Sequence, residues 1–364
     1  MLLTMFAGAQ ERQVESHQVN ADRSVTFRYV DPAATAVGVN VDGVAKAQPM
    51  TKGADGVWTV TTPAMAPEIY GYSFEVDGRQ ALDPHNPKTT INLLDIENVM
   101  EVPGDGPQPW DVQAVPHGQI RMEFYTTHVV TGLPENQDAF WVYTPPDYDP
   151  KAKKEYPVLY LLHGFSDDAS GWTAVGRANL ILDNMIAKGQ AKPMMVVMPL
   201  GYGEMSFVRE GFRSWQTEAT VAGNLSLYQQ TLLTEVMPRV EGEFRVSKKR
   251  EDRAIAGLSM GGLESLSIGL NNTDKFAYVG GFSSAAKYID QAKLAGLTPK
   301  TADLRVLWIA CGTEDGLLQS NRDFISFLKA KNMTVTAIET PGMHDWMVWR
   351  DNLLHFAPLL FQGK

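Results

Sequence analysis

Ser259 is the residue whose position in the sequence most clearly predicts a chemical role. It lies between two glycines in Gly257-Leu258-Ser259-Met260-Gly261. An apolar run, Ala254-Ile255-Ala256, precedes it, and a segment of helical character, residues 262–268, follows it. Where a strand turns this sharply into a helix, the serine takes a strained conformation, and side chains two positions to either side would clash. The turn exposes Oγ and directs N–H groups of the helix start toward a developing negative charge. The segment therefore predicts a nucleophilic serine.

Two carboxylates are candidates for the acid that orients the catalytic base. Acyl transfer by serine needs a base to take the Oγ proton and an acid to orient that base. In the expected order the acid follows the serine along the chain, on a loop after a strand. Glu314 and Asp315 lie in such a loop, directly after an apolar run that ends at Ala310. Asp315, which precedes Gly316, is better placed in a tight loop, so Asp315 is the prediction and Glu314 the alternative.

The base must come after this acid, where the chain offers only His344 and His355. His344 occupies Pro341-Gly342-Met343-His344-Asp345-Trp346, after the strand-like residues 335–338. His355 falls in a predicted C-terminal helix and is interpreted as a packing residue. The position and the glycine-rich loop therefore predict His344 as the base.

The oxyanion hole needs one N–H from the residue after the nucleophile and one from a loop after an earlier strand. Met260 provides the first. Leu161-Leu162-His163-Gly164-Phe165 provides the second, with the Phe165 N–H as the predicted donor. His163 lies upstream of the serine and is predicted to brace this loop. Four aromatic residues in loops or next to these groups are candidates for a substrate wall or, alternatively, for packing under the loops: Trp172, Tyr202, Trp215 and Trp346.

Composition limits the class of partner. The chain has 364 residues and a formal net charge of −10, which argues against nucleic-acid and anionic-membrane partners, because phosphate binding needs a basic surface. Its one cysteine, Cys311, lies in an apolar run and excludes an internal disulfide. The histidines lack metal-ligand spacing, so no metal or cofactor is predicted. No apolar stretch is long enough to span a membrane.

The first ten residues are apolar and end in Ala7-Gly8-Ala9-Gln10, like the last part of a secretory signal. They lack a basic start. We expect a secreted or periplasmic protein, with a cytoplasmic location as the alternative. Residues 1–19 are assigned to an N-terminal tail.

Two regions differ in their periodicity. Residues 20–102 show apolar alternation at period two, with Asp-Gly turn signals, and predict a small all-β sandwich. A Pro/Gly-rich linker is predicted at 103–117 and a catalytic domain at 118–364. There, apolar runs such as residues 158–162 and 253–256 predict strands buried on both faces of a mostly parallel sheet. Helical spacing recurs between the runs at two sets of positions: Leu180, Ile181, Met185 and Ile186 before Gly189, and Tyr228, Leu232, Val236 and Val240.

His163-Gly164, the segment 256–262, the Cys-Gly-Thr-Glu-Asp loop and the Gly-Met-His-Asp loop together resemble the esterase D group of α/β-hydrolases. The resemblance is closest to feruloyl and acetylxylan esterases of carbohydrate esterase family 1, from about residue 118 to the C-terminus. It implies an α/β-hydrolase fold and a triad of Ser259, Asp315 and His344. It also implies hydrolysis of feruloyl or acetyl esters on xylan, and the choice of acyl group stays open.

The front region, with Asp55-Gly56-Val57-Trp58 and residues 70–78, resembles an immunoglobulin-like glycan-binding module. Trp58 and Tyr72 are candidates to stack on sugars, although alternate strand positions favour a core role. Three other functions stay open: an enterochelin-type siderophore esterase, a mycolyl-type acyltransferase, and a glycan-binding protein without catalysis. The acidic charge speaks against the first, the second would require a long lipid groove, and the complete set of catalytic groups speaks against the third. The oligomeric state also stays open.

Overall fold

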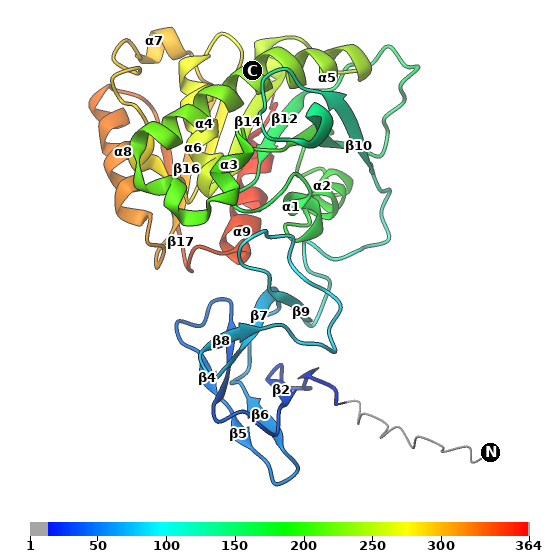
Figure 1. The fold of residues 1–364 in the computed structure, drawn as a ribbon. Helices are drawn as coiled ribbons and strands as arrows, with labels where there is room; N and C mark the ends of the chain where they lie inside the picture. The colour runs from blue at the N-terminus through cyan, green and yellow to red at the C-terminus, as the bar shows by residue number, and fades with distance from the viewer. Residues whose placement is uncertain (1–13, 363–364) are drawn as a thin grey trace, which may run out of the picture. The chain divides into compact units, whose positions relative to one another are not determined.

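The computed structural model describes residues 14–362, and the chain divides into two compact units (Figure 1). The first comprises residues up to 90 together with 97–106, and the second comprises Ile91–Ile96 and the chain from Pro107 onward. The predicted signal remnant at 1–10 lies outside the described residues. Among residues 14–362, no helix has the length and apolarity needed to cross a bilayer.

The N-terminal unit contains two antiparallel sheets whose order is β1-β2-β6-β5 and β4-β3-β7-β8, with β9 also paired to β7. Alternating residues such as Val25, Phe27, Tyr72 and Phe74 are buried, as expected of a sandwich. β1 pairs with β2, so the first sheet begins inside the predicted tail. The strands are β1 (His17–Val19), β2 (Val25–Val30), β3 (Val37–Val41), β4 (Gln48–Pro49), β5 (Thr51–Lys52), β6 (Val57–Thr61), β7 (Glu68–Val76), β8 (Arg79–Ala81) and β9 (Asn98–Val102).

Trp58 and Tyr72 are core residues of this unit. The Trp58 side chain is buried, and its Nε1–H donates to the Asp31 carbonyl at 2.9 Å. Tyr72 is fully buried, and its hydroxyl donates to the Asp83 carboxylate at 2.7 Å. Neither ring is available for stacking on a sugar, so the core interpretation is confirmed.

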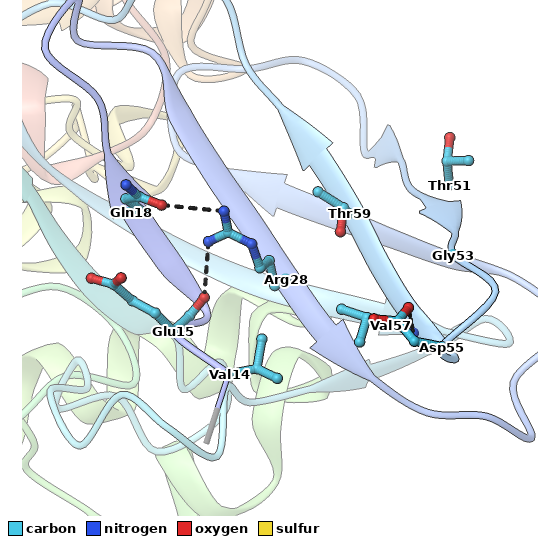
Figure 2. A pocket seen from close by; sticks show the side chains of 9 residues that line it. All are labelled: Val14, Glu15, Gln18, Arg28, Thr51, Gly53, Asp55, Val57 and Thr59. Atoms are coloured by element: carbon cyan, nitrogen blue, oxygen red, sulfur yellow. Dashed lines mark hydrogen bonds between the residues drawn. The ribbon is translucent and has the colours of Figure 1, made fainter. Parts of the chain in front are cut away.

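A depression of about 550 Å³ lies on the N-terminal unit, and Figure 2 shows its lining. Arg28 is one of the lining residues, and it donates to the Glu15 carbonyl and to Gln18 Oε1, both at 3.2 Å (Figure 2). The nine lining residues are polar, small or aliphatic: Val14, Glu15, Gln18, Arg28, Thr51, Gly53, Asp55, Val57 and Thr59. The depression therefore offers hydrogen-bonding groups but, among these nine, no aromatic platform for a sugar.

The second unit contains an eight-stranded sheet in the order β10-β11-β13-β12-β14-β15-β16-β17. Its pairs are parallel from β13 to β17, and β11 joins β10 and β13 in antiparallel fashion. This is the mostly parallel sheet of an α/β-hydrolase, as predicted. The strands are β10 (Gln119–Thr126), β11 (Gln137–Thr144), β12 (Val158–Leu162), β13 (Met195–Pro199), β14 (Arg253–Leu258), β15 (Tyr278–Phe282), β16 (Val306–Gly312) and β17 (Thr336–Thr340).

Helices cover both faces of this sheet (Figure 1), as two neighbouring glycines of β15 show. A Cβ on Gly280 would lie 2.8 Å from Phe356 of α9, and one on Gly281 would lie 2.8 Å from Leu266 of α6. Because successive strand residues point to opposite faces, α6 and α9 pack on opposite sides. The helices are α1 (Gly171–Ala174), α2 (Ala178–Ala187), α3 (Met205–Arg209), α4 (Glu218–Thr231), α5 (Met237–Glu243), α6 (Ser259–Asn271), α7 (Pro299–Ala302), α8 (Leu318–Ala330) and α9 (Trp346–Phe356).

Both predicted helical patterns are confirmed. α2 ends two residues before Gly189, whose φ of +68° suits glycine at a helix end. The second pattern extends over α4, a π-helical turn at Leu232–Val236 and α5. Its four apolar residues, 228, 232, 236 and 240, are fully buried.

The predicted linker is shorter than expected, because most of it packs with the second unit. Asn184 Nδ2 donates to the carbonyls of Pro109 and Asp111 at 2.8 and 2.9 Å. His117 Nδ1 lies 2.9 Å from the Asp183 carboxylate. The residues from 107 to 117 therefore belong to the catalytic unit. These contacts could not be predicted from the Pro/Gly-rich composition of the segment.

Candidate active site

Ser259 lies at a sharp turn between β14 and α6, as the sequence predicted. Its φ is +52°, in the left-handed region that L-residues rarely adopt. A Cβ on Gly257 would lie 2.6 Å from the Gly261 backbone, and a Cβ on Gly261 would lie 2.5 Å from the His163 carbonyl oxygen. No side chain fits at these distances, which confirms the requirement for both glycines.

Ser259, His344 and Asp315 come together at the carboxyl edge of the sheet. Ser259 Oγ lies 3.0 Å from His344 Nε2, and His344 Nδ1 lies 2.8 Å from Asp315 Oδ2. The His344 side chain is 37% exposed, whereas the Asp315 carboxylate is buried. A hydroxyl beside an imidazole that a buried carboxylate orients has the geometry for nucleophilic acyl transfer.

Asp315, and not Glu314, faces the imidazole. Burial on its own would raise the pKa of Asp315, but its hydrogen bond and charge interaction with His344 outweigh burial and hold that pKa below the ordinary value. The Leu317 N–H also donates to Asp315 Oδ1 at 2.8 Å. Glu314 is exposed, and its N–H donates to the Gly342 carbonyl at 2.9 Å.

Backbone contacts join the loop that carries the acid to the loop that carries the base. Besides the Glu314–Gly342 bond, the Thr313 N–H donates to the Thr340 carbonyl at 2.8 Å. α9 then begins at once, because the Asp345 side chain accepts from the Val348 N–H at 3.1 Å and caps the helix. These contacts fix the backbone on both sides of His344. His355 lies on the exposed side of α9, which corrects its interpretation as a packing residue.

His163 braces the loop after β12, as predicted. It is buried, its Nδ1–H donates to the Gly164 carbonyl at 2.7 Å, and its Nε2 accepts from the Gly201 N–H at 2.8 Å. These partners require the neutral ring protonated at Nδ1. Burial lowers the pKa of His163 to about 4.

The His163–Phe165 loop passes directly beside the nucleophile. A Cβ on Gly164 would lie 3.5 Å from Ser259 Cβ, so the next peptide, which carries the Phe165 N–H, adjoins Ser259. Met260 lies in the first turn of α6, where a helix leaves its N–H groups without an intrahelical acceptor. Gly164 and Met260 therefore both adjoin Ser259, and the role of the Phe165 and Met260 N–H groups as oxyanion donors stays a prediction.

His163 should make folding sensitive to acid. The folded-state pKa is lowered, so its contribution to stability is present above the ordinary pKa and is lost as the pH falls toward 4. Between about pH 7.5 and about pH 5, the unfolding free energy of the wild type should fall by about 2 kcal/mol because of His163. His163→Gln should not show this part of the decrease. Urea unfolding at both pH values measures this difference. The exposed His355→Gln serves as the control, and equal pH dependence in wild type and His163→Gln would contradict the expectation.

The four aromatic residues that the sequence proposed for a substrate wall differ in their burial. Trp172 and Tyr202 are fully buried, and they donate to the carbonyls of Leu162 at 2.9 Å and Asp167 at 3.0 Å. This corrects their assignment to a substrate wall: from the core side, both support the loop at residues 163–167, called the oxyanion loop below. Trp346 is buried against Trp172, with ring centroids 5.3 Å apart. Trp215 is partly exposed.

Phe165, Phe212 and Trp215 form an aromatic cluster at the oxyanion loop, and the sequence proposed a substrate-wall role only for Trp215. Trp215 packs edge-on against Phe165 at 5.4 Å between ring centroids. Phe212, which the sequence did not single out, lies 5.5 Å from Phe165 and is 71% exposed. A single phenylalanine between Gly211 and Arg213 carries no distinguishing pattern, so no signal was available for it.

A serine at a strand–helix turn, oriented by a histidine and a buried aspartate on this sheet, defines a hydrolase of the α/β class. The family model named Esterase matches residues 134–359, and the chain belongs to this family. It is a carboxylic ester hydrolase.

Two curated relatives are esterases of bacteria. An endo-1,4-beta-xylanase/feruloyl esterase of Xylanibacter ruminicola is 29% identical over 357 residues, which cover 96% of this chain and 46% of the relative. An acetyl esterase of Caldicellulosiruptor saccharolyticus is 26% identical over 227 residues, 53% of this chain and 78% of the relative. The chain thus spans less than half the length of the first relative.

Solved structures show the same fold. A ferulic acid esterase of carbohydrate esterase family 1 from Anaeromyces mucronatus has a TM-score of 0.61 and 26% identity, covering 70% of this chain and 96% of the other. The enterobactin esterase of Shigella flexneri has a TM-score of 0.69 over 92% of both chains, at 19% identity. The second likeness concerns the fold alone.

Proposed function

We propose that this esterase removes feruloyl groups from xylan through an acyl-enzyme on Ser259, with His344 as the base and Asp315 as its orienting acid. The observation that carries the catalytic part is the pair of contacts at 3.0 and 2.8 Å that links the three side chains. Together they provide a proton path from the hydroxyl to the imidazole and a fixed carboxylate behind it.

In the proposed cycle, Ser259 Oγ bonds to the ester carbonyl carbon while His344 Nε2 takes the hydroxyl proton. The N–H groups of Phe165 and Met260 hold the oxyanion, an effect worth about 3–4 kcal/mol for one such donor in related chemistry. The C–O bond to the sugar breaks, and the sugar oxygen leaves with the proton from His344. Water then attacks the acyl carbon while His344 takes its proton. The bond between the acyl carbon and Ser259 Oγ breaks, and Oγ regains the proton from His344 as the acid leaves.

The aromatic cluster beside the oxyanion loop supports an aromatic acyl group. Phe165, Phe212 and Trp215 present ring surface next to the peptide that would hold the oxyanion. An acetyl group would not reach such a surface, whereas a cinnamoyl-type ring would bury apolar area on it. The Xylanibacter relative is a xylanase/feruloyl esterase and the Anaeromyces relative a ferulic acid esterase, which supports the same acyl group.

The proposal is tested by measuring kcat/KM on methyl ferulate and 4-nitrophenyl acetate, and the ferulic and acetic acid released from arabinoxylan. A preference for ferulate on both kinds of substrate is expected. Release of acetic acid alone would replace the feruloyl assignment with an acetyl one. Enterobactin belongs in the same assay, because the fold matches an enterobactin esterase over both units. The net charge of −10 disfavours a highly charged ferric catecholate.

Phe212→Ala should raise the KM for methyl ferulate by about 10-fold, because a buried aromatic contact is worth about 1–2 kcal/mol, and should leave 4-nitrophenyl acetate unaffected. The side chain is 71% exposed, so the free energy of unfolding should not change. Steady-state kinetics on both esters measure the effect. Phe124→Ala, an exposed phenylalanine on β10, is the matched control. An unchanged KM for methyl ferulate would remove Phe212 from the acyl site.

We further propose that the N-terminal unit binds the polysaccharide chain and that the protein acts outside the cytoplasm. With Trp58 and Tyr72 buried, this binding would depend on hydrogen-bonding groups such as those of the depression in Figure 2. Arg28→Ala should then weaken retention on insoluble xylan without changing kcat on methyl ferulate. Xylan binding without release of any acid would instead favour a glycan-binding protein without catalysis.

A further inference from the structure

Residues Ile91–Ile96 form a strap that leaves the N-terminal unit after Thr90 and returns to it at Glu97, but packs with the catalytic unit. Its two ends are joined to each other: the Thr90 N–H donates to the Glu97 carbonyl at 2.8 Å, and the Glu97 N–H donates to Thr90 Oγ1 at 2.9 Å. The strap is therefore a closed loop with a defined base.

The strap bonds directly to the oxyanion loop. The Leu93 N–H donates to the Ser166 carbonyl at 2.7 Å, and Asn92 Nδ2 donates to Asp167 Oδ1 at 3.1 Å. Asn92 Oδ1 in turn accepts from the N–H groups of Leu94 and Asp95 at 3.0 and 2.8 Å. The Asn92 amide thus uses its oxygen to stabilise the turn of the strap and its nitrogen to bind Asp167. Because one side chain makes both contacts, the conformation of the turn fixes the position of the bond to Asp167.

The residues that receive these bonds are held in an unfavourable state. Ser166 has a φ of +69°, a conformation that persists for a non-glycine residue only where its surroundings determine it. Asp167 is buried, which raises the pKa of its carboxyl to about 8, while the Asn92 hydrogen bond acts in the opposite direction. The Tyr202 hydroxyl, at 3.0 Å, secures the Asp167 carbonyl from the core side.

Ser166 follows Phe165, whose N–H is the proposed oxyanion donor beside Ser259. A rotation at Ser166 would turn the Phe165–Ser166 peptide and displace Phe165, and with it the Gly164–Phe165 peptide that carries the Phe165 N–H. We propose that Asn92 and Leu93 are positioning residues, which hold Ser166 in its left-handed conformation and thereby direct the Phe165 N–H toward the oxyanion. This inference rests on the proposed role of Ser259 in ester hydrolysis but not on the identity of the acyl group.

Positioning acts on the transition state, where the oxyanion exists, and little on substrate binding. Loss of a strap bond should therefore lower kcat and leave KM nearly unchanged. A full loss of one oxyanion donor costs about 10²–10³-fold in kcat, so a misdirected donor should cost about 10-fold or more. The loss should be the same for a small and a large acyl group, since both form the same oxyanion.

The test uses the full chain and compares Leu93→Pro, which removes the N–H, with Leu93→Ala, which keeps it. Asn92→Ala removes the second bond, and Leu94→Ala, an exposed residue of the same strap, is the matched control. We expect kcat on 4-nitrophenyl acetate and on methyl ferulate to fall by about 10-fold or more in Leu93→Pro and Asn92→Ala at nearly constant KM. Leu93→Ala should recover most of the loss seen with proline.

Three results would overturn the inference. One is unchanged kcat in both Asn92→Ala and folded Leu93→Pro; if circular dichroism shows that the proline variant does not fold, Asn92→Ala decides alone. The second is a loss confined to methyl ferulate with a raised KM, which would make the strap a substrate contact. The third is equal loss in Leu93→Ala and Leu93→Pro. Ser259→Ala is assayed in parallel. If Ser259→Ala kept its turnover, the proposed function itself would have failed, whereas an inactive Ser259→Ala means that the three results above concern the strap alone.

Discussion

Ser259→Ala is expected to lower kcat on methyl ferulate by about 10⁶-fold, the scale seen when a triad serine is removed in related chemistry. The Oγ is the atom that bonds to the carbonyl carbon, and it lies 3.0 Å from the base. Alanine keeps the Cβ and removes only this atom. Far-ultraviolet circular dichroism should show an unchanged fold, and release of ferulic acid measures turnover.

A second substitution separates catalysis from backbone strain. Ser259 has a φ of +52°, a conformation that costs a non-glycine residue free energy of about 1 kcal/mol or more. Ser259→Gly should therefore unfold at higher urea concentration than Ser259→Ala, although both are inactive. Turnover near that of the wild type in either variant would exclude serine catalysis at this position.

Asp315→Asn is expected to lower kcat by about 10⁴-fold, because an amide in place of the carboxylate favours the wrong tautomer of the catalytic histidine. The structure shows why this position matters: Asp315 Oδ2 accepts from His344 Nδ1 at 2.8 Å, and the carboxylate is buried. The KM should change little, since Asp315 acts through His344. Steady-state kinetics on 4-nitrophenyl acetate, whose good leaving group simplifies the assay, give both constants.

Glu314→Gln is the matched control for this prediction. It makes the same chemical change one residue away, on an exposed side chain, and leaves the backbone bond to Gly342 in place. Its kcat should stay within about twofold of the wild type, as for most surface substitutions. If Glu314→Gln were the damaging variant and Asp315→Asn the neutral one, the acid would have to be reassigned.

The turn at Ser259 was predictable because the two glycines that it requires lie within two residues of the serine in the sequence. The clashes that exclude side chains at positions 257 and 261 arise from backbone within a few residues and from the adjoining strand β12. The order of Ser259, Asp315 and His344 was informative for a different reason. Each follows a strand of one parallel sheet, and the carboxyl ends of parallel strands meet at one edge.

The choice between Glu314 and Asp315 depended on more than spacing. Two adjacent carboxylates have the same local sequence environment, and only the folded loops show that Glu314 is exposed while Asp315 faces the base. The aromatic residues show the same limit. Trp172 and Tyr202 support the oxyanion loop from the core, whereas Phe212 is exposed, and no periodicity in a loop distinguishes these sides.

The amino-acid sequence alone determined the α/β sheet, the nucleophile turn and the order of the groups that meet there, because apolar periodicity, glycine requirements and strand polarity are encoded within short segments. Tertiary structure alone decided which aromatic rings face outward and that residues 91–96 bond to the oxyanion loop. Those contacts join segments about seventy residues apart in the chain. Their free energy depends on distances and burial that exist only after the whole unit has packed.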